Sequence, residues 1–84
     1  METFKVLSDP VRRGVLVCLK DGSKTAGELS SMMNLTPAAM SYHLNKLKEF
    51  DLVRERKSKN FVYYELNMTV IESMILWLQT LGGS

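Results

Sequence analysis

Residues 36–50 read TPAAMSYHLNKLKEF, and their apolar side chains recur at the spacing of an amphipathic α-helix. Met40, Leu44 and Leu47 share one stripe of such a helix, which would face the protein core. Small, hydrogen-bonding and basic side chains fall on the opposite side. We therefore expect a helix that is anchored on one face and free to contact a partner on the other.

Helix-start signals also occur near the N-terminus. Asp9 can cap a helix with its carboxylate, and Pro10 suits the first helical position. These signals predict a short helix over residues 2–7 and a second helix from Pro10 to about Lys20.

A third helix is predicted to begin at Thr25, because Thr25 and Glu28 have the spacing of a capping box. Its expected apolar arc consists of Ala26, Leu29, Met32 and Met33. Asn34 can close this helix, since Asn tolerates the left-handed conformation better than most residues. Only residues 34–36 would then separate the third helix from the fourth, which is the spacing of a helix-turn-helix.

After the fourth helix the apolar residues recur at every second position, which is the spacing of a β-strand. Leu52–Lys57 and Asn60–Leu66 are predicted to form an antiparallel hairpin, and a last helix is predicted over Met68–Leu81. The expected fold is one domain of residues 1–84, mostly α with a small β-hairpin wing, in the order α-α-α-α-β-β-α. That order describes a winged helix-turn-helix.

Charge is unevenly distributed along the chain. The whole sequence carries a net charge of only +2, but residues 36–60 hold six Lys or Arg against three Asp or Glu. A basic segment on a nearly neutral body indicates a polyanionic partner, because binding needs local rather than global charge.

The outward side of the fourth helix, residues 37–49, is suited to the major groove of DNA, which admits one helix. The predicted DNA contacts are Thr36, Ala38, Ala39, Ser41, Tyr42, His43, Asn45 and Lys46. The alternative is a merely solvated face. His43 could equally form a structural hydrogen bond.

The hairpin tip carries a concentration of basic residues that is typical of a wing on phosphates or in the minor groove. The predicted contacts are Arg54, Arg56, Lys57, Lys59 and Asn60. A solvated tip is the alternative. Arg12 and Arg13 on the second helix could bind phosphates or form structural ion pairs.

The last helix is apolar over an arc wider than the roughly 100° that one packing face requires. A chain of 84 residues is also marginal as a monomer. We therefore expect the terminal helices, about 2–7 and 68–81, to form a homodimer interface. Its predicted residues are Phe4, Val6, Leu7, Val70, Ile71, Met74, Ile75, Trp77, Leu78 and Leu81. Two-fold pairing predicts a palindromic DNA site.

Three segments resemble the ArsR-type (arsenic-repressor-like) bacterial transcription regulators. They are SDPVRRGVLVCL at 8–19, TAGELSSMMNLTPAAMSYHLNKLKEFDLV at 25–53 and FVYYELN at 61–67. The short length and the C-terminal SMILWLQTL are most similar to the small SdpR-type autorepressor branch of that family. The resemblance implies a homodimeric repressor that binds an inverted-repeat operator in double-stranded DNA, often near its own promoter.

Sensor and enzyme functions have little support in the sequence. With one Cys and one His, no thiolate or zinc site is expected, and the third helix lacks the Cys-x-Cys pattern that metal-sensing relatives carry. Cys18 is interpreted as a buried apolar residue, a redox sensor being the alternative. No catalytic motif is present, so neither an enzyme nor a cofactor is expected.

Two other functions remain open: a winged-helix protein-interaction module without DNA binding, and a metal- or thiol-responsive repressor. A protein anti-repressor is a possible partner. The longest apolar runs have five residues, so no membrane insertion is expected, and a single cysteine fits the reducing cytoplasm.

Overall fold

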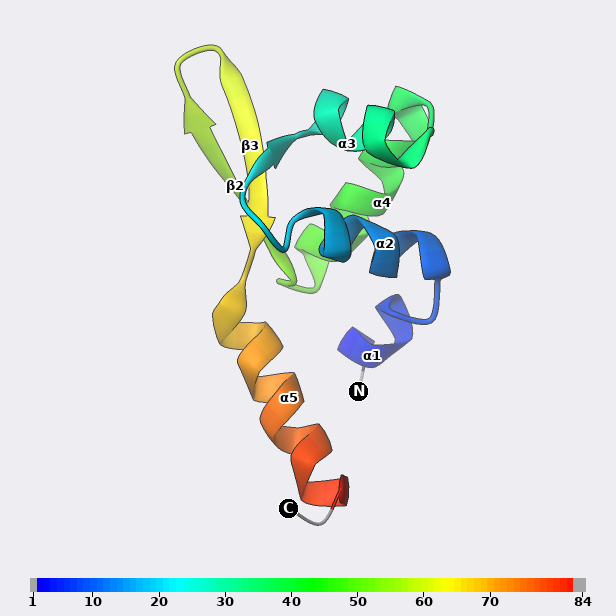
Figure 1. The fold of residues 1–84 in the computed structure, drawn as a ribbon, viewed down its shortest axis with the longest axis vertical. Helices are drawn as coiled ribbons and strands as arrows, with labels where there is room; N and C mark the ends of the chain where they lie inside the picture. The colour runs from blue at the N-terminus through cyan, green and yellow to red at the C-terminus, as the bar shows by residue number, and fades with distance from the viewer. Residues whose placement is uncertain (1, 83–84) are drawn as a thin grey trace.

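The computed structural model describes residues 2–82, in which a group of helices carries a strand hairpin at one end and a projecting helix at the other (Figure 1). The helices are α1 (Glu2–Val6), α2 (Pro10–Cys18), α3 (Ala26–Met33), α4 (Pro37–Glu49) and α5 (Met68–Gly82). The strands are β1 (Lys24–Thr25), β2 (Val53–Ser58) and β3 (Phe61–Leu66). This arrangement confirms the predicted winged helix-turn-helix.

Side-chain caps fix where the helices begin and end. The Asp9 carboxylate accepts a hydrogen bond of 2.7 Å from the Val11 amide at the start of α2. Both halves of the capping box between Thr25 and Glu28 are present at the start of α3. Asn34 ends α3 in the left-handed conformation, with φ of 54°. All three predictions are confirmed, and the sharp turn at Asn34 sets α4 across α3.

The core lies where α2, α3 and α4 meet the root of the hairpin. Its most completely buried side chains are Val15, Leu29, Met40, Leu44, Leu47, Leu52 and Val53. Burying each such side chain contributes roughly 1.5–3 kcal/mol relative to leaving it exposed. The apolar stripe of α4 is therefore the main anchor of that helix.

The sheet has one strand more than the sequence predicted. β2 and β3 pair antiparallel from Val53 opposite Leu66 to Ser58 opposite Phe61, around a two-residue turn. β1 adds to the free edge of β3 and gives the strand order β1-β3-β2. A strand of two residues has no detectable period, so the expectation of a hairpin alone was incomplete.

Two local expectations were wrong. α2 ends at Cys18, two residues before the expected end near Lys20, because the Leu19 and Lys20 amides form the tighter hydrogen bonds to the carbonyls three residues back, those of Leu16 and Val17. Met32, expected in the apolar arc of α3, is 54% exposed. A helix as short as α3 buries only the narrow stripe around Leu29. No helix within residues 2–82 has both the length and the apolar character to cross a bilayer.

Candidate nucleic-acid interface

The two faces of α4 are divided as the sequence predicted. Met40, Leu44 and Leu47 are at most 1% exposed, whereas Tyr42 on the other side is 56% exposed. Among the other predicted contacts, three are exposed: Ala38, Ser41 and Asn45. Three more are half-buried: Ala39, His43 and Lys46. The helix thus presents a methyl group, a hydroxyl, a phenol and an amide on one accessible surface.

The start of α4 is both capped and exposed. Thr36 Oγ1 accepts a hydrogen bond of 3.1 Å from the Ala39 amide, and Pro37 occupies the first turn. The Thr36 hydroxyl keeps its proton for donation to another acceptor. Free amides and the positive end of the helix dipole suit a phosphate at this position.

Tyr42 lies in a small cluster on the exposed side of α4. Its ring meets the His43 ring edge-on, with centroids 5.4 Å apart, and the Lys46 ammonium lies 6.0 Å from the Tyr42 ring centroid. His43 Nδ1 is buried and has no hydrogen-bond partner within residues 2–82. A structural hydrogen bond, one of the two roles expected for His43, is therefore not made through this atom.

The basic side chains of the wing fall into two groups. Arg54 and Arg56 are held at its base: Arg54 Nη2 donates to Asn67 Oδ1 at 2.8 Å, and Arg56 Nη2 donates to Ser23 Oγ at 3.1 Å. The Arg56 guanidinium also lies 3.9 Å from the Glu65 carboxylate and 5.2 Å from the Tyr63 ring centroid.

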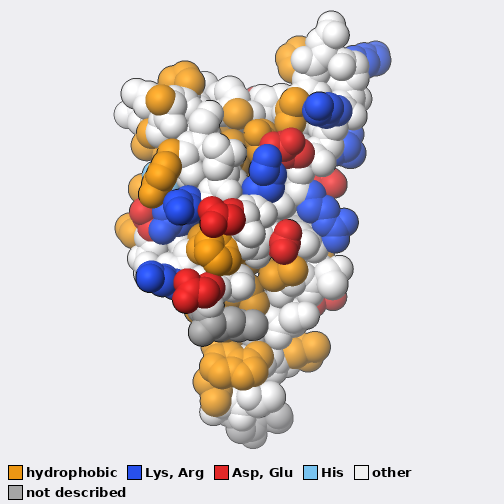
Figure 2. All heavy atoms as spheres, turned by 180° about the vertical axis from the view of Figure 1, so that it is seen from behind, with side chains coloured by type: hydrophobic (Ala, Val, Ile, Leu, Met, Phe, Trp, Pro, Cys, Tyr) orange, Lys and Arg blue, Asp and Glu red, His pale blue; other side chains and the backbone are white. Residues whose placement is uncertain are grey.

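The second group stands near the tip of the wing. Lys57, Lys59 and Asn60 are exposed, and neither lysine forms an ion pair within the described part of the chain. Figure 2 shows Lys and Arg side chains spaced along the projecting wing. Charge at the tip is thus available to a polyanion, while the arginines near the base have intramolecular partners.

An ion pair that the sequence did not reveal joins the wing to α4. Lys48 Nζ donates to Glu55 Oε1 at 2.7 Å. This hydrogen bond lowers the pKa of the Glu55 carboxyl and raises the pKa of the Lys48 ammonium. Burial of the Tyr64 phenol, followed by the charge of Glu55, raises the pKa of Tyr64.

Arg12 and Arg13 have structural partners on the preceding turn. Arg12 Nε donates to the Val6 carbonyl and Arg13 Nη1 to the Leu7 carbonyl, both at 2.7 Å. Arg12 also lies 3.7 Å from the Asp9 carboxylate. Both arginines therefore fasten α2 to the end of α1, which favours the structural role.

The predicted interface residues on the terminal helices differ in exposure. Val6 and Met74 are buried in the core of this protomer, and Phe4, Leu7, Val70 and Ile71 pack half-buried against it. The accessible members lie further along α5: Ile75, Trp77, Leu78 and Leu81, each 47% exposed or more. The rings of Phe4 and Trp77 are 5.5 Å apart, so α1 and α5 form one surface. Hydrophobic side chains gather there in Figure 2.

Within residues 2–82, no three His, Cys, Asp or Glu side chains converge on a point that could hold a metal ion. Cys18 is half-buried against the core.

Residues 7–56 match a family described as a helix-turn-helix domain. The transcriptional repressor SdpR of Bacillus subtilis is 40% identical over 89% of this chain and 83% of its own length. An ArsR-like transcriptional regulator from Rhodococcus sp. RHA1 superposes with a TM-score of 0.85 at 25% identity, over 95% of this chain and 76% of the other. The chain belongs to the ArsR-type family of winged helix-turn-helix transcriptional regulators.

A second relative of this ArsR-type protein is the transcriptional activator HlyU of Vibrio cholerae. It is 36% identical over 93% of this chain and 72% of its own length. The structure of reduced HlyU superposes with a TM-score of 0.76 over 93% of this chain and 82% of that one. The resemblance stated from the sequence is thereby confirmed, and relatives of the ArsR-type chain include both a repressor and an activator by name.

Proposed function

We propose that this ArsR-type protein is a homodimeric, sequence-specific repressor that acts on double-stranded DNA in the cytoplasm. In this proposal α4 enters the major groove of a palindromic operator near the protein's own promoter. The wing neutralises phosphates beside it or enters the minor groove. The repressor SdpR, at 40% identity, supports repression rather than activation.

The observation that carries the proposal is the exposed side of α4 beside a basic wing. Asn can pair with adenine in the major groove, a hydroxyl can meet either a donor or an acceptor, and an alanine methyl can meet a thymine methyl. Asn45, Ser41 and Ala38 supply these groups on one accessible surface. Lys57 and Lys59 supply cations that have no ion-pair partner within the described residues.

The proposed dimer rests on the accessible apolar surface of α5. The exposed side chains of Ile75 and Leu78 continue into an apolar groove of about 340 Å³ between α2 and α5, and among residues 2–82 Lys20 is the only charged residue that lines it. A second copy of the chain would cover this surface. Two-fold pairing would then set the two α4 helices roughly 34–36 Å apart, which is one turn of DNA.

The test is fluorescence anisotropy with labelled DNA from the region upstream of the protein's own gene. A shuffled duplex of the same composition serves as the control. We expect tighter binding to the upstream fragment, an affinity that falls steeply with salt, and lower transcription from that promoter in a reporter assay. Equal affinity for both duplexes would contradict specific recognition, and an absence of DNA binding would favour a protein-interaction module. Higher transcription would indicate an activator.

A further inference from the structure

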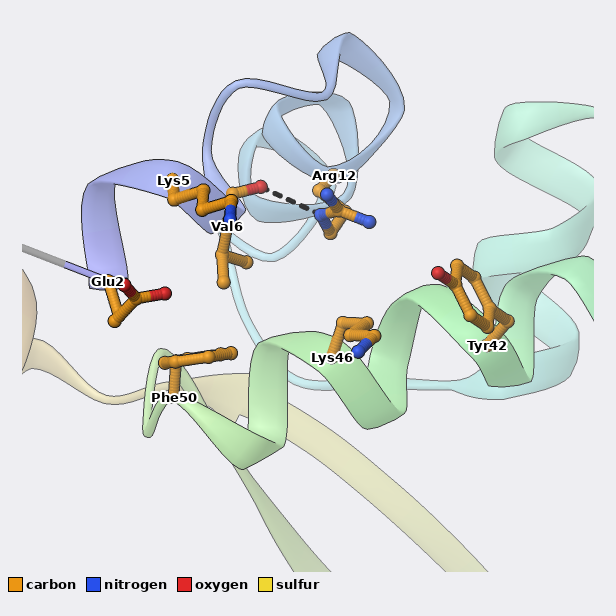
Figure 3. A pocket seen from close by; sticks show the side chains of 7 residues that line it. All are labelled: Glu2, Lys5, Val6, Arg12, Tyr42, Lys46 and Phe50. Atoms are coloured by element: carbon orange, nitrogen blue, oxygen red, sulfur yellow. Dashed lines mark hydrogen bonds between the residues drawn. The ribbon is translucent and has the colours of Figure 1, made fainter.

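A cavity of about 280 Å³ lies between α1, α2 and α4, next to the proposed DNA-reading surface. Three cationic side chains line it, Lys5, Arg12 and Lys46, each from a different helix. Figure 3 shows these side chains arranged around one opening, together with the rings of Tyr42 and Phe50. The volume is close to the lower end of the range for small-molecule pockets.

Arg12 is the most buried of the three cations that line the cavity. Its side chain is only 14% exposed, and its Nε donates to the Val6 carbonyl at 2.7 Å. The Asp9 carboxylate lies at 3.7 Å, beyond hydrogen-bond distance, so the guanidinium keeps donors for another acceptor. A guanidinium held in place in this way matches the geometry of a carboxylate or a phosphate.

The residues that line the cavity include three cations and one acid, and two further acids, Asp9 and Glu49, lie beside Arg12 and Lys46 outside the lining. The Lys46 ammonium lies 3.8 Å from the Glu49 carboxylate, and the two side chains are 41% and 60% exposed, so this pair is weak and Lys46 can turn to a new anion. Glu2 is the one acidic residue of the lining, against three cations. Phe50 and Val6 add an apolar wall to the cavity. A purely charged ligand would gain nothing from this wall, whereas an apolar group attached to the anion could pack against it.

We propose that this cavity binds a small organic anion, a carboxylate or phosphate ester with a flat apolar body, and that the bound anion weakens DNA binding. The anionic group would lie between Arg12, Lys5 and Lys46. The apolar body would lie against Phe50. The regulatory part rests on the proposed function, whereas anion binding by the free protein does not.

The coupling follows from residues that serve both surfaces. Tyr42 and Lys46 line the cavity and also belong to the proposed DNA-reading face of α4. A bound anion would engage the Lys46 ammonium and place negative charge where DNA phosphates would approach. Because coupling between sites is reciprocal, DNA must weaken anion binding by the same factor.

The first experiment titrates the free protein with phenyl phosphate. Phenol is the uncharged control compound, and inorganic phosphate is the control compound without a ring. We expect phenyl phosphate to shift the Arg12 Nε–H and Phe50 amide signals in ¹H–¹⁵N spectra, and to bind at least about tenfold more tightly than either control compound. Lys5→Met should weaken phenyl phosphate binding about fivefold or more, whereas Lys24→Met, at a lysine that lines neither this cavity nor the apolar groove, should not. No shift at these residues up to about 10 mM phenyl phosphate would overturn the proposal.

The second experiment measures DNA affinity with phenyl phosphate at constant ionic strength. We expect the apparent Kd for DNA to rise when phenyl phosphate is added to the wild type or to Lys24→Met, and to change much less in Lys5→Met. Lys5→Met should bind DNA normally without the anion. A loss of DNA affinity in that condition would assign the cavity to a backbone phosphate of DNA and overturn the proposal.

The failures of the two proposals can be told apart. Anion binding without any change in DNA affinity would overturn the regulatory part alone. An absence of DNA binding by the anion-free wild type would overturn the proposed function and the regulatory part with it. The titration of the free protein would then decide the anion site by itself.

Discussion

Lys48 Nζ lies 2.7 Å from Glu55 Oε1 and joins the last turn of α4 to the first strand of the wing. The two residues are seven positions apart, across the turn that separates helix from hairpin. The contact links the side chain of an α4 residue directly to β2, although an ion pair this exposed contributes little to stability. Its charges also give the wing a measurable titration signature.

The Glu55 carboxyl group should titrate below the ordinary Glu pKa of about 4.5, because the hydrogen bond from the Lys48 ammonium stabilises the carboxylate. The NMR signal of its carboxyl carbon reports the midpoint. Lys48→Met should raise that midpoint, and Lys20→Met should leave it unchanged; NMR titration measures both. Since the folded-state pKa is lowered, the stabilisation is present above the unfolded value and is lost as the pH falls through the folded value. An unchanged midpoint in Lys48→Met would show that the ion pair does not form in solution.

Asn45→Ala and Lys57→Ala should weaken DNA binding in different ways. Asn45 is placed to read base edges, so its loss should cost about 1–3 kcal/mol on the operator and little on shuffled DNA. Lys57 is placed on phosphates, so its loss should weaken both duplexes and reduce the salt slope by about one. Anisotropy over a salt series separates the two effects, with Glu72→Ala, at an exposed α5 site outside every predicted contact, as the control. If both variants behaved like Glu72→Ala, the proposed interface would be wrong.

Leu81→Glu should dissociate the dimer. Leu81 is 69% exposed at the end of α5, and a carboxylate there would be buried without a partner in the proposed interface. Met32→Glu makes the same change at an exposed site on α3 and should leave the dimer intact. Sedimentation equilibrium measures the mass of each variant. A dimer that survives Leu81→Glu would place the interface elsewhere.

Thr36→Ala should destabilise the fold by about 1 kcal/mol, because it removes the side-chain cap at the start of α4. Thr36→Ser keeps the hydroxyl and should retain most of the stability. Urea unfolding of the two variants tests this difference. Equal stability of Thr36→Ala and the wild type would mean that the hydrogen bond from the Ala39 amide contributes nothing in solution.

Local signals account for the parts of the fold that the sequence predicted. The Thr25–Glu28 capping box, the left-handed Asn34 and the buried stripe of α4 all depend on residues within a few positions of one another. Such interactions can be recognised in the sequence because helix geometry brings residues three and four positions apart onto one face. The outward position of Tyr42 follows from the same geometry.

The features that the sequence missed depend on contacts between distant segments. Lys24 pairs with Tyr64, and Ser23 accepts from Arg56 across 33 positions, so neither has a local signature. The contacts of Arg56 with Glu65 and Tyr63 on β3 had no local signature either, and the role of the basic wing residues on DNA stays a prediction. Burial of Met74 depends likewise on where α5 packs against the body.

Thr25 pairs with Tyr63 in β3 and also caps α3, so a single residue belongs to the wing and to the helix-turn-helix at once. A swing of the whole hairpin would have to break the pairing of β1 with β3 or disturb the cap of α3. We therefore expect the wing and α4 to bind a DNA duplex as one rigid unit, with their relative positions already set. Little backbone conformational entropy would then be lost on DNA binding, whereas a flexible arm would first have to be immobilised.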